Sequence, residues 1–473
     1  MRGLVHRSIH YGAKQARENS RQNRRTPWRQ RGRYTACVTS ETADIAIVGA
    51  GAAGLMAGIW AGRAACANGG PQARPKIVLL DGAKSLGAKI LVAGGGRCNV
   101  THDVVDDLAF AGSSRNAIRK VLRRFDVPHT IEFFRESGVD LKREETGKLF
   151  PTTDKARTVL DALVNAARRA GAEIRNPWRV ESVTAGPDSR FIIAGPSGEL
   201  AAKSVILASG GKSLPKTGSD GHGYAIARTL GHSITPRVFP ALVPLTLPKD
   251  HFICGLSGLS TIARLEVRSG TGKKLHEFTD SMLCTHFGLS GPGVLDISRY
   301  YTDVKMHDAS AQLVVNWLPE EDVESVDRAL ANLGKVSSGR WLRERAWGGG
   351  SNALPHRLAE ALCVQADVDP SAPAHHLTRE KRRTLARTIA EMPLPVTGDR
   401  GFAYAEVTAG GVPLSELKLE TMESRTRSGL YIIGEVCDVD GRIGGYNFQW
   451  AWASGFVAGT AAGSACQAHS VTA

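Results

Sequence analysis

Two strand-and-glycine-turn segments at opposite ends of the chain limit its fold more than any other feature. Near the start, the apolar run DIAIV leads into GAGAAGLMAGIWAGRAA, a glycine-rich turn followed by small, helix-compatible residues. In a dinucleotide-binding unit, Gly49 would make the tight turn, Gly51 would let a pyrophosphate approach the backbone, and Gly54 would let helix and strand pack closely. The helix N-terminus would offer free N–H groups to the phosphates. We therefore expect a Rossmann-type fold that begins at Asp44.

A second predicted strand supports this interpretation. The run KIVLLD ends at Asp81, whose carboxylate is placed to accept hydrogen bonds from ribose hydroxyls. The spacing from Gly54 to Asp81 is longer than usual, because the loop CANGGPQARPK lies between them. A lone GxGxxG is also typical of ordinary glycine-rich turns, but here a strand precedes it and a helix follows.

The segment AGGGRCNVTH brings the backbone close to another group. Its successive glycines and the polar side chains of Arg97, Asn99 and Thr101 indicate either a bound cofactor or a tight surface turn. Cys98 is either a redox thiol or a small residue buried beside the cofactor. Flavin disulfide reductases carry two cysteines on such a segment, and Cys98 has no cysteine nearby, which favours the second interpretation.

The C-terminal segment SGLYIIGEVCDVDGRIGGYNFQWAWASG repeats the strand–turn–helix pattern. Glu435, at the end of its strand, is suited to a ribityl hydroxyl of FAD. Gly444, Gly445, Tyr446 and Asn447 come at a predicted helix N-terminus, whose positive dipole end suits the negative charge of a reduced flavin. A nicotinamide cofactor alone does not require this second unit. The two ends together therefore predict FAD.

The middle of the chain changes character twice. Apolar positions at helical spacing predict helices over residues 115–175, interrupted by a polar loop whose Arg143, Lys148 and Lys155 either face a substrate or are solvated. The strand KSVILASGG then returns to the cofactor domain. Short strands broken by Gly and Pro follow from residue 236 and predict an inserted antiparallel sheet or barrel. Its loop THFGLSGPG, with His286 and Ser290, is either a substrate-facing loop or a plain turn.

These patterns predict the following division of the chain. Residues 1–43 form a basic leader. Residues 44–235 and 413–473 form the FAD-binding domain. Residues 236–318 and the return strand at 395–412 form the inserted β domain, and residues 319–394 form a helical subdomain within it.

Charge and cysteine usage bear on the surroundings of the protein. The leader holds ten of the basic residues and only two acidic ones, so it accounts for most of the net charge of +14. It is interpreted as disordered, and as an organelle transit peptide, a nucleic-acid-binding arm or a dispensable extension. The 8 cysteines form no CxxC pair, which indicates a reducing compartment. We expect a cytoplasmic protein without a membrane span, and no oligomeric state is indicated.

Seven motifs in one order resemble the BaiN-type NAD(P)/FAD-dependent oxidoreductases, also called the aminoacetone oxidase family of FAD-binding enzymes. They are DIAIVGAGAAGL, AGGGRCNVTH, GKLFPTTDKA, GGKSLPKTGSDGHGY, THFGLSGP, EVTAGGV and GEVCDVDGRIGGYNFQWAWASG. The resemblance covers residues 44–465. It implies a glutathione-reductase-like FAD domain split by a β-barrel domain, which a small helical domain interrupts. Asp81 stands where this family commonly has Glu, and Ser209 stands where it commonly has Thr.

From the motifs and the resemblance together we expect one cofactor, FAD, and a set of residues along it. They are Gly49, Gly51, Ala52, Ala53, Gly54, Asp81, Gly82, Lys89, Gly95, Arg97, Cys98, Asn99, Val180, Ser209, Gly210, Gly211, Gly434, Glu435, Gly444, Gly445, Tyr446 and Asn447.

The expected activity is an FAD-dependent oxidoreduction. NAD(P)H, bound transiently, would give a hydride through the flavin to a small or steroid-like unsaturated substrate. One alternative is an amine oxidase that acts on aminoacetone-like substrates with oxygen, and another is a non-catalytic or RNA-associated flavoprotein. The basic leader is the one feature of the sequence that supports a nucleic-acid partner. No metal site or catalytic triad is evident, and Cys98, His286 and Tyr446 are the candidate acid–base groups.

Overall fold

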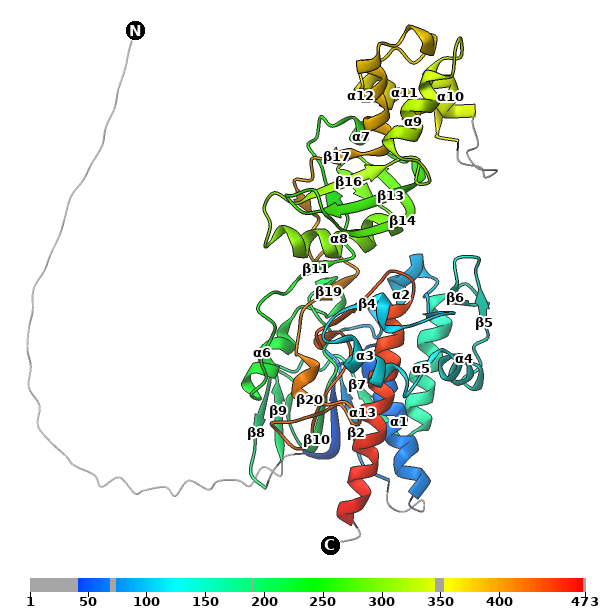
Figure 1. The fold of residues 1–473 in the computed structure, drawn as a ribbon. Helices are drawn as coiled ribbons and strands as arrows, with labels where there is room; N and C mark the ends of the chain where they lie inside the picture. Colours follow the sequence, from blue (N-terminus) through cyan, green and yellow to red (C-terminus); the bar gives the residue numbers. More distant parts are fainter. Residues whose placement is uncertain (1–40, 69–73, 189, 345–352, 471–473) are drawn as a thin grey trace, which may run out of the picture. The chain divides into compact units, whose positions relative to one another are not determined.

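The computed structural model describes residues 41–68, 74–188, 190–344 and 353–470 (Figure 1). The predicted leader therefore lies almost wholly outside the described residues. The prediction of a mixed α/β fold is confirmed, with a strand–turn–helix at each end. β1 (Glu41–Val48) leads into α1 (Ala52–Asn68), and β22 (Leu430–Ile432) precedes α13 (Tyr446–Ser470).

The sheet that contains β1 and β22 has a parallel centre. β1 lies between β10 and β2, β22 flanks β10, and β7 flanks β2, all in parallel pairs. Its central strands are buried along most of their length, as expected for a parallel sheet covered on both faces. The remaining strands of this sheet are β2 (Ile77–Leu80), β7 (Ala172–Arg175), β8 (Ser182–Ala185), β9 (Phe191–Gly195), β10 (Gly198–Leu207), β20 (Leu417–Lys418) and β21 (Glu423–Ser424).

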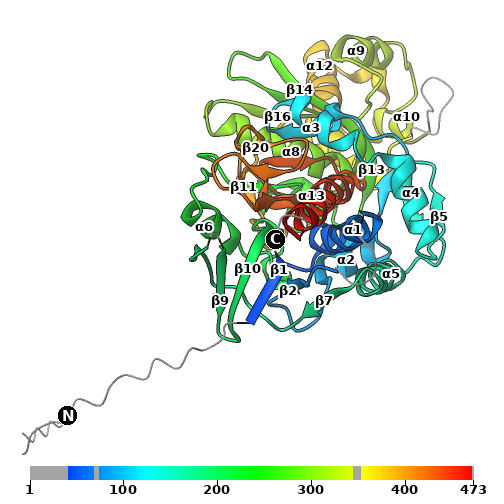
Figure 2. The ribbon, with the colours of Figure 1, turned by 90° about the horizontal axis from the view of Figure 1, so that it is seen from below.

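The helices α1 and α13 pack side by side with their backbones in contact (Figure 2). Glycines of α13 at four-residue spacing lie on alanines of α1 at the same spacing. A Cβ atom added to Gly459 would lie 2.3 Å from the Ala57 carbonyl oxygen. The successive contacts are Gly455 on Ala53, Gly459 on Ala57 and Gly463 on Ala61. Because both series advance in the same direction, the helices are parallel and their N-termini lie at the same end.

Further short elements surround this centre. They are the helices α2 (Ala88–Val92), α3 (Arg115–Leu122), α4 (Val127–Glu136), α5 (Ala156–Arg169) and α6 (His222–Thr229), the 3₁₀ turns η2 (Ala93–Gly96), η3 (Asp107–Ala109), η4 (Pro215–Thr217), η6 (Leu414–Glu416) and η7 (Gly434–Val436), and the paired strands β3 (Thr101–His102), β4 (Phe110–Gly112), β5 (Leu141–Arg143), β6 (Lys148–Pro151), β11 (Phe239–Ala241), β19 (Val407–Ala409) and β23 (Val439–Gly441).

The inserted segment contains a second, antiparallel sheet with its own apolar core. Its strands follow the path β17-β16-β13-β14-β15-β12-β18, and closure of this path into a barrel stays a prediction. These strands are β12 (Leu245–Thr246), β13 (Ser260–Arg268), β14 (Lys274–Thr285), β15 (Gly288–Ser290), β16 (Gln312–Asn316), β17 (Met392–Leu394) and β18 (Gly398–Asp399). The accompanying helices are α7 (Phe252–Gly255), α8 (Pro292–Lys305), α9 (Val323–Ala331), α10 (Ser338–Glu344), α11 (His356–Gln365), η5 (Ala374–His376) and α12 (Arg379–Ala390).

Within the described ranges, no helix combines the length and the apolar character needed to cross a membrane.

The α1–α13 contact gives a stability prediction. We expect Gly459→Ala to lower the free energy of unfolding by about 1–3 kcal/mol, because the new methyl group would meet the backbone of Ala57. Urea denaturation followed by circular dichroism measures this. Gly255→Ala is the matched control, because a Cβ atom there meets nothing within 4 Å. Equal stability of the two variants would contradict the packing described.

Candidate cofactor-binding and active site

A cavity of about 450 Å³ lies where the N-termini of α1 and α13 meet the ends of the parallel strands. Residues from both ends of the chain line it, together with Leu242, Glu406 and Val407 from the inserted segment. It is therefore built by parts of the sequence that are hundreds of residues apart.

The first glycine turn leaves room for a ligand at one position only. Gly49 has a φ of +101°, and a Cβ atom on it would lie 2.5 Å from the Ala208 carbonyl oxygen. A Cβ atom on Gly54 would lie 1.9 Å from the Gly49 carbonyl oxygen. At Gly51 a Cβ atom would meet nothing within 4 Å, and this residue lines the cavity. Gly49 and Gly54 thus allow the backbone to pack closely, whereas Gly51 exposes its backbone to the cavity, as the binding of a pyrophosphate requires.

Asp81 fixes the glycine turn from the next strand. Its carboxylate accepts the Ala50 N–H at 2.7 Å and the Ala83 N–H at 2.8 Å. The carboxylate also lines the cavity, and its oxygens keep further lone pairs for a ligand's hydroxyl groups. Part of the long loop that precedes this strand lies outside the described residues.

Several buried polar atoms beside the cavity lack a partner. The Asn99 Oδ1, Ser209 Oγ and Ser219 Oγ atoms have no hydrogen bond to any described residue, and all three residues line the cavity. Buried polar groups of native proteins are nearly always hydrogen-bonded. The residues present therefore fit a polar ligand that supplies these hydrogen bonds, as the ribityl, phosphate and ring atoms of FAD would.

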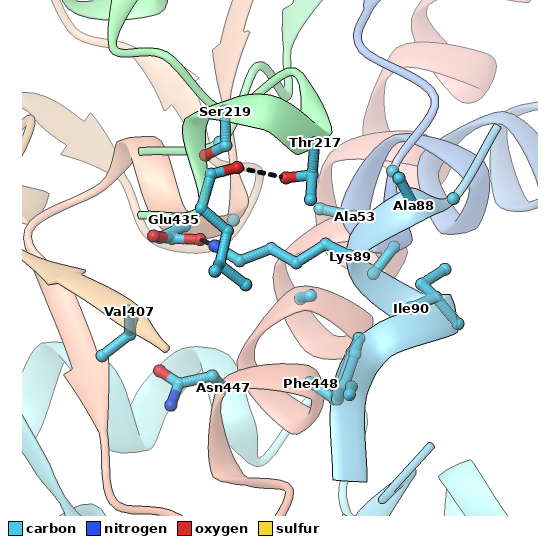
Figure 3. Close-up of a pocket in the computed structure, with 18 of the residues that line it drawn as sticks. Ala53, Ala88, Lys89, Ile90, Thr217, Ser219, Val407, Glu435, Asn447 and Phe448 are labelled. Carbon is cyan, nitrogen blue, oxygen red and sulfur yellow. Dashed lines mark hydrogen bonds and ion pairs between the residues drawn. The ribbon is translucent and has the colours of Figure 1, made fainter. Parts of the chain in front are cut away.

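A charged network crosses the cavity from α2 to η7 (Figure 3). The Lys89 Nζ atom lies 2.5 Å from Glu435 Oε2 and donates to Ser213 Oγ at 2.6 Å. Ser213 Oγ is also 2.7 Å from Glu435 Oε1, which in addition accepts the Thr408 N–H at 3.0 Å. Glu435 is thereby held in one place by groups from three distant parts of the chain.

The second glycine turn is held by its own helix and by the insertion. Asn447 accepts the Gly441 N–H at 2.8 Å and donates to the Gly441 carbonyl at 2.9 Å. Asp296 of α8 accepts the Ile443 N–H at 2.8 Å and the Arg442 Nε–H at 2.9 Å. The backbone that leads into α13 is thus fixed from two sides, and residues 442–445 and Asn447 line the cavity.

Most of the predicted cofactor residues line this one cavity. They are Gly49, Gly51, Ala52, Ala53, Asp81, Gly82, Lys89, Gly95, Arg97, Asn99, Val180, Ser209, Gly210, Gly434, Glu435, Gly444, Gly445 and Asn447. The remaining four, Gly54, Cys98, Gly211 and Tyr446, are not in its lining. A Cβ atom on Gly211 would lie 2.5 Å from Thr408 Oγ1, so this glycine serves packing as Gly54 does.

The three candidate acid–base groups lie off the cavity. Cys98 is fully buried, and burial raises the pKa of its thiol to about 12, so it stays protonated. The Tyr446 ring stacks on His102 with 5.0 Å between ring centroids. His286 is exposed on the hairpin turn between β14 and β15. The predicted polar loop forms the β5–β6 hairpin and the short stretch that leads into α5. Lys148 of this hairpin lines the cavity, whereas Arg143 and Lys155 do not.

Sequence reasoning missed several lining residues. Leu214, Leu242, Glu406, Val407, Arg442, Ile443 and Phe448 were not expected there. Glu406 and Val407 belong to the motif EVTAGGV, but neither was among the residues expected along FAD. Among the described residues, no group of three or more His, Cys, Asp and Glu side chains is arranged to hold a metal ion.

A family model and two curated proteins match this chain over most of its length. The family model described as the HI0933-like protein Rossmann domain matches residues 43–461. The chain is 35% identical over 419 residues to a 3-dehydro-bile acid delta(4,6)-reductase of Clostridium scindens, covering 88% of this chain and 98% of the relative. It is 33% identical over 416 residues to a ribosomal RNA dihydrouridine synthase of Escherichia coli, covering 88% and 96%.

A solved structure with a related course of the chain is a 3-ketosteroid-delta4-(5alpha)-dehydrogenase of Rhodococcus jostii. It is 16% identical with a TM-score of 0.44, covering 91% of this chain and 99% of that chain.

The open space at Gly51 gives a binding prediction. Gly51→Ala should leave the stability of the FAD-free protein unchanged, because the added methyl group meets no protein atom. The same methyl group should weaken FAD binding at least ~10-fold by filling the approach to the backbone. Thermal melts of the FAD-free protein and a fluorescence titration with FAD measure the two effects. Wild-type affinity in this variant would contradict the placement.

Two neighbouring carboxyl groups, the half-buried Asp438 and the buried Asp440, come just before the second glycine turn and give a pH prediction. Burial, with a smaller contribution from nearby Asp440, raises the pKa of Asp438 to about 6. Since the folded-state pKa lies above the ordinary value, the folded protein gains stability as the pH falls below about 6 and loses it as the pH rises through this value. Asp438→Asn removes this dependence.

We therefore expect Asp438→Asn to raise the melting temperature above about pH 7 and to leave it unchanged near pH 4. Differential scanning fluorimetry of the FAD-loaded protein across this range measures the effect. Asp161→Asn, an exposed position on α5, is the control. A constant offset between wild type and Asp438→Asn at every pH would show that this carboxyl does not titrate with a raised pKa.

Proposed function

The chain is an FAD-dependent oxidoreductase of the HI0933-like Rossmann family, and we propose that it moves a hydride from NAD(P)H to a double bond conjugated with a carbonyl group. FAD, when bound, supplies the hydride-transfer chemistry. The observation that carries the proposal is the single cavity onto which both glycine-rich turns open.

The residues proposed to hold FAD follow the cavity from one helix N-terminus to the other. The bare backbone at Gly51 suits the pyrophosphate, Asp81 suits the ribose, and Glu435 suits the ribityl chain. Gly445 and Asn447, at the start of α13, are proposed to lie beside the flavin ring, where the positive end of the helix dipole favours negative charge.

In this proposal the segments have separate tasks. Residues 44–235 and 413–473 bind the cofactor. Residues 236–318 and 395–412 bring Leu242, Glu406 and Val407 to the cavity and so face the substrate, while residues 319–394 form a helical subdomain farther along the insertion.

The names of the relatives support the proposed substrate class. One is named for a delta(4,6)-reduction of a 3-dehydro-bile acid, and the other for the synthesis of dihydrouridine in ribosomal RNA. Both names describe the addition of hydrogen to an unsaturated ring. The apolar side chains of Leu242, Val407, Ile443 and Phe448 line this cavity and suit a flat ring of that kind.

A second candidate substrate is a uridine base in RNA. Besides the name of the Escherichia coli relative, the basic side chains of Arg97, Lys148 and Arg442 in the cavity lining favour it. Such side chains attract phosphate groups.

Anaerobic stopped-flow absorbance tests the proposed function. NADH or NADPH should bleach the flavin of the FAD-loaded protein, and 4-androstene-3,17-dione or a uridine-containing ribosomal RNA fragment should restore its colour. Reoxidation by RNA alone would select the second candidate. If aminoacetone bleaches the flavin and neither nicotinamide does, the protein is an amine oxidase and the proposal is wrong.

A further inference from the structure

Glu406 reaches the cavity from a rigidly held backbone. It lies just before β19, where its N–H donates to the Leu242 carbonyl at 3.1 Å. Its own carbonyl accepts Ser213 Oγ at 3.3 Å, and Ser213 belongs to the network of Lys89 and Glu435. The main chain at Glu406 is therefore fixed on both sides, and Glu406 is one of the residues that line the cavity.

The carboxyl group of Glu406 differs from the other carboxyl groups of the cavity. It has no hydrogen bond or ion pair with any described residue. Each of the others has at least one partner: Asp81 accepts two backbone N–H groups, Glu144 pairs with Arg97, Asp220 pairs with Arg179, and Glu435 pairs with Lys89. A carboxyl group left without a protein partner in a ligand cavity is available to a ligand.

The surroundings of Glu406 favour its neutral form. Glu406 is exposed at the open cavity, and the protein packed around it still raises the pKa of this carboxyl group above its usual range. Lys89 is the charged group that acts on it, and the ammonium only partly offsets the effect of burial. Lys89 is itself engaged by Glu435 and Ser213.

The proposed reaction requires a proton as well as a hydride. When a hydride adds to the β carbon of a carbon–carbon double bond conjugated with a carbonyl group, the π electrons move toward the α carbon and the carbonyl oxygen. The α carbon must then gain a proton. Side chains that transfer such a proton typically contribute a factor of about 10²–10⁴ to the rate.

We propose that Glu406 is the group that protonates the α carbon of the substrate. The proposal rests on the proposed function. The O–H bond of the Glu406 carboxyl group breaks as the new C–H bond forms, and the resulting carboxylate regains its proton from water. In balance, NAD(P)H supplies two electrons and one proton as a hydride, one solvent proton is consumed, and the products are NAD(P)⁺ and the saturated substrate.

Lys148 is the competing donor within the cavity lining, because its ammonium group also has no hydrogen bond or ion pair with a described residue. It lies beside the second glycine turn, where its Cε atom is 3.6 Å from the position of a Cβ atom on Gly444. Glu406 is favoured because its surroundings raise the pKa of its carboxyl group and so favour the proton-donating form, and the carboxylate left after donation is stabilised by the nearby Lys89 ammonium.

The decisive experiment separates the two half-reactions of the FAD-loaded enzyme. In Glu406→Gln, bleaching of the flavin by NAD(P)H should proceed at the wild-type rate, because no proton is donated to substrate in that step. Reoxidation by whichever probe the wild type reduces, 4-androstene-3,17-dione or the uridine-containing RNA fragment, should slow at least ~100-fold. Glu406→Asp should recover part of the rate. Glu420→Gln, an exposed position, should behave as wild type.

Other outcomes of this experiment would overturn either the role of Glu406 alone or the proposed function as well. Wild-type reoxidation in Glu406→Gln overturns this inference alone, and loss of reoxidation in Lys148→Met with full retention in Glu406→Gln assigns the proton to Lys148. A wild-type flavin that no nicotinamide bleaches, or that neither probe reoxidises, overturns the proposed function and the inference with it.

A second measurement needs no substrate. The infrared difference spectrum of wild type minus Glu406→Gln, recorded across a pH titration, should show a protonated carboxyl band that disappears at a higher pH than an ordinary glutamate side chain requires. A band that disappears at the ordinary glutamate pH would overturn the inference even if the variant were slow.

Discussion

The close contact between α1 and α13 is the constraint on which the rest of the structure depends. The two helices come from opposite ends of the chain, and their backbones touch because glycines of one face alanines of the other. Any larger side chain at Gly455, Gly459 or Gly463 would separate them. Since the helices are parallel, both positive dipole ends open onto one cavity, which suits a ligand with negative charge at two distant points.

The inserted segment also holds the second glycine turn in place. Asp296 on α8 binds the turn before α13, and Arg299 on the same helix pairs with the buried Asp440 of β23. These contacts connect the second glycine turn to α8 of the inserted segment, so the position of the residues proposed to lie at the flavin ring depends on both. The insertion also delivers Glu406 to the cavity, through a backbone that Ser213 and Leu242 hold in place.

The parts of the fold that follow from local sequence were predictable. The GxGxxG spacing predicts the separate roles of Gly49, Gly51 and Gly54, and the structure shows them. Both strand–turn–helix units lie at the residues where the sequence pattern predicts them. The direction of a side chain at a helix start is harder to predict. Tyr446 and Asn447 are neighbours in sequence, yet about 100° of helical rotation turns one toward His102 and the other toward the cavity. Glu406 could not be assigned because its role depends on contacts with residues 160 or more positions away.

The claim that one FAD molecule spans the N-termini of α1 and α13 is central to this account. A crystal structure of the FAD-loaded protein tests it most directly. The account predicts the pyrophosphate against the backbone at Gly51 and the flavin ring beside Asn447, with the Glu406 carboxyl group open to the remaining space. FAD that touches only one of the two helix N-termini, or that binds outside this cavity, would contradict it.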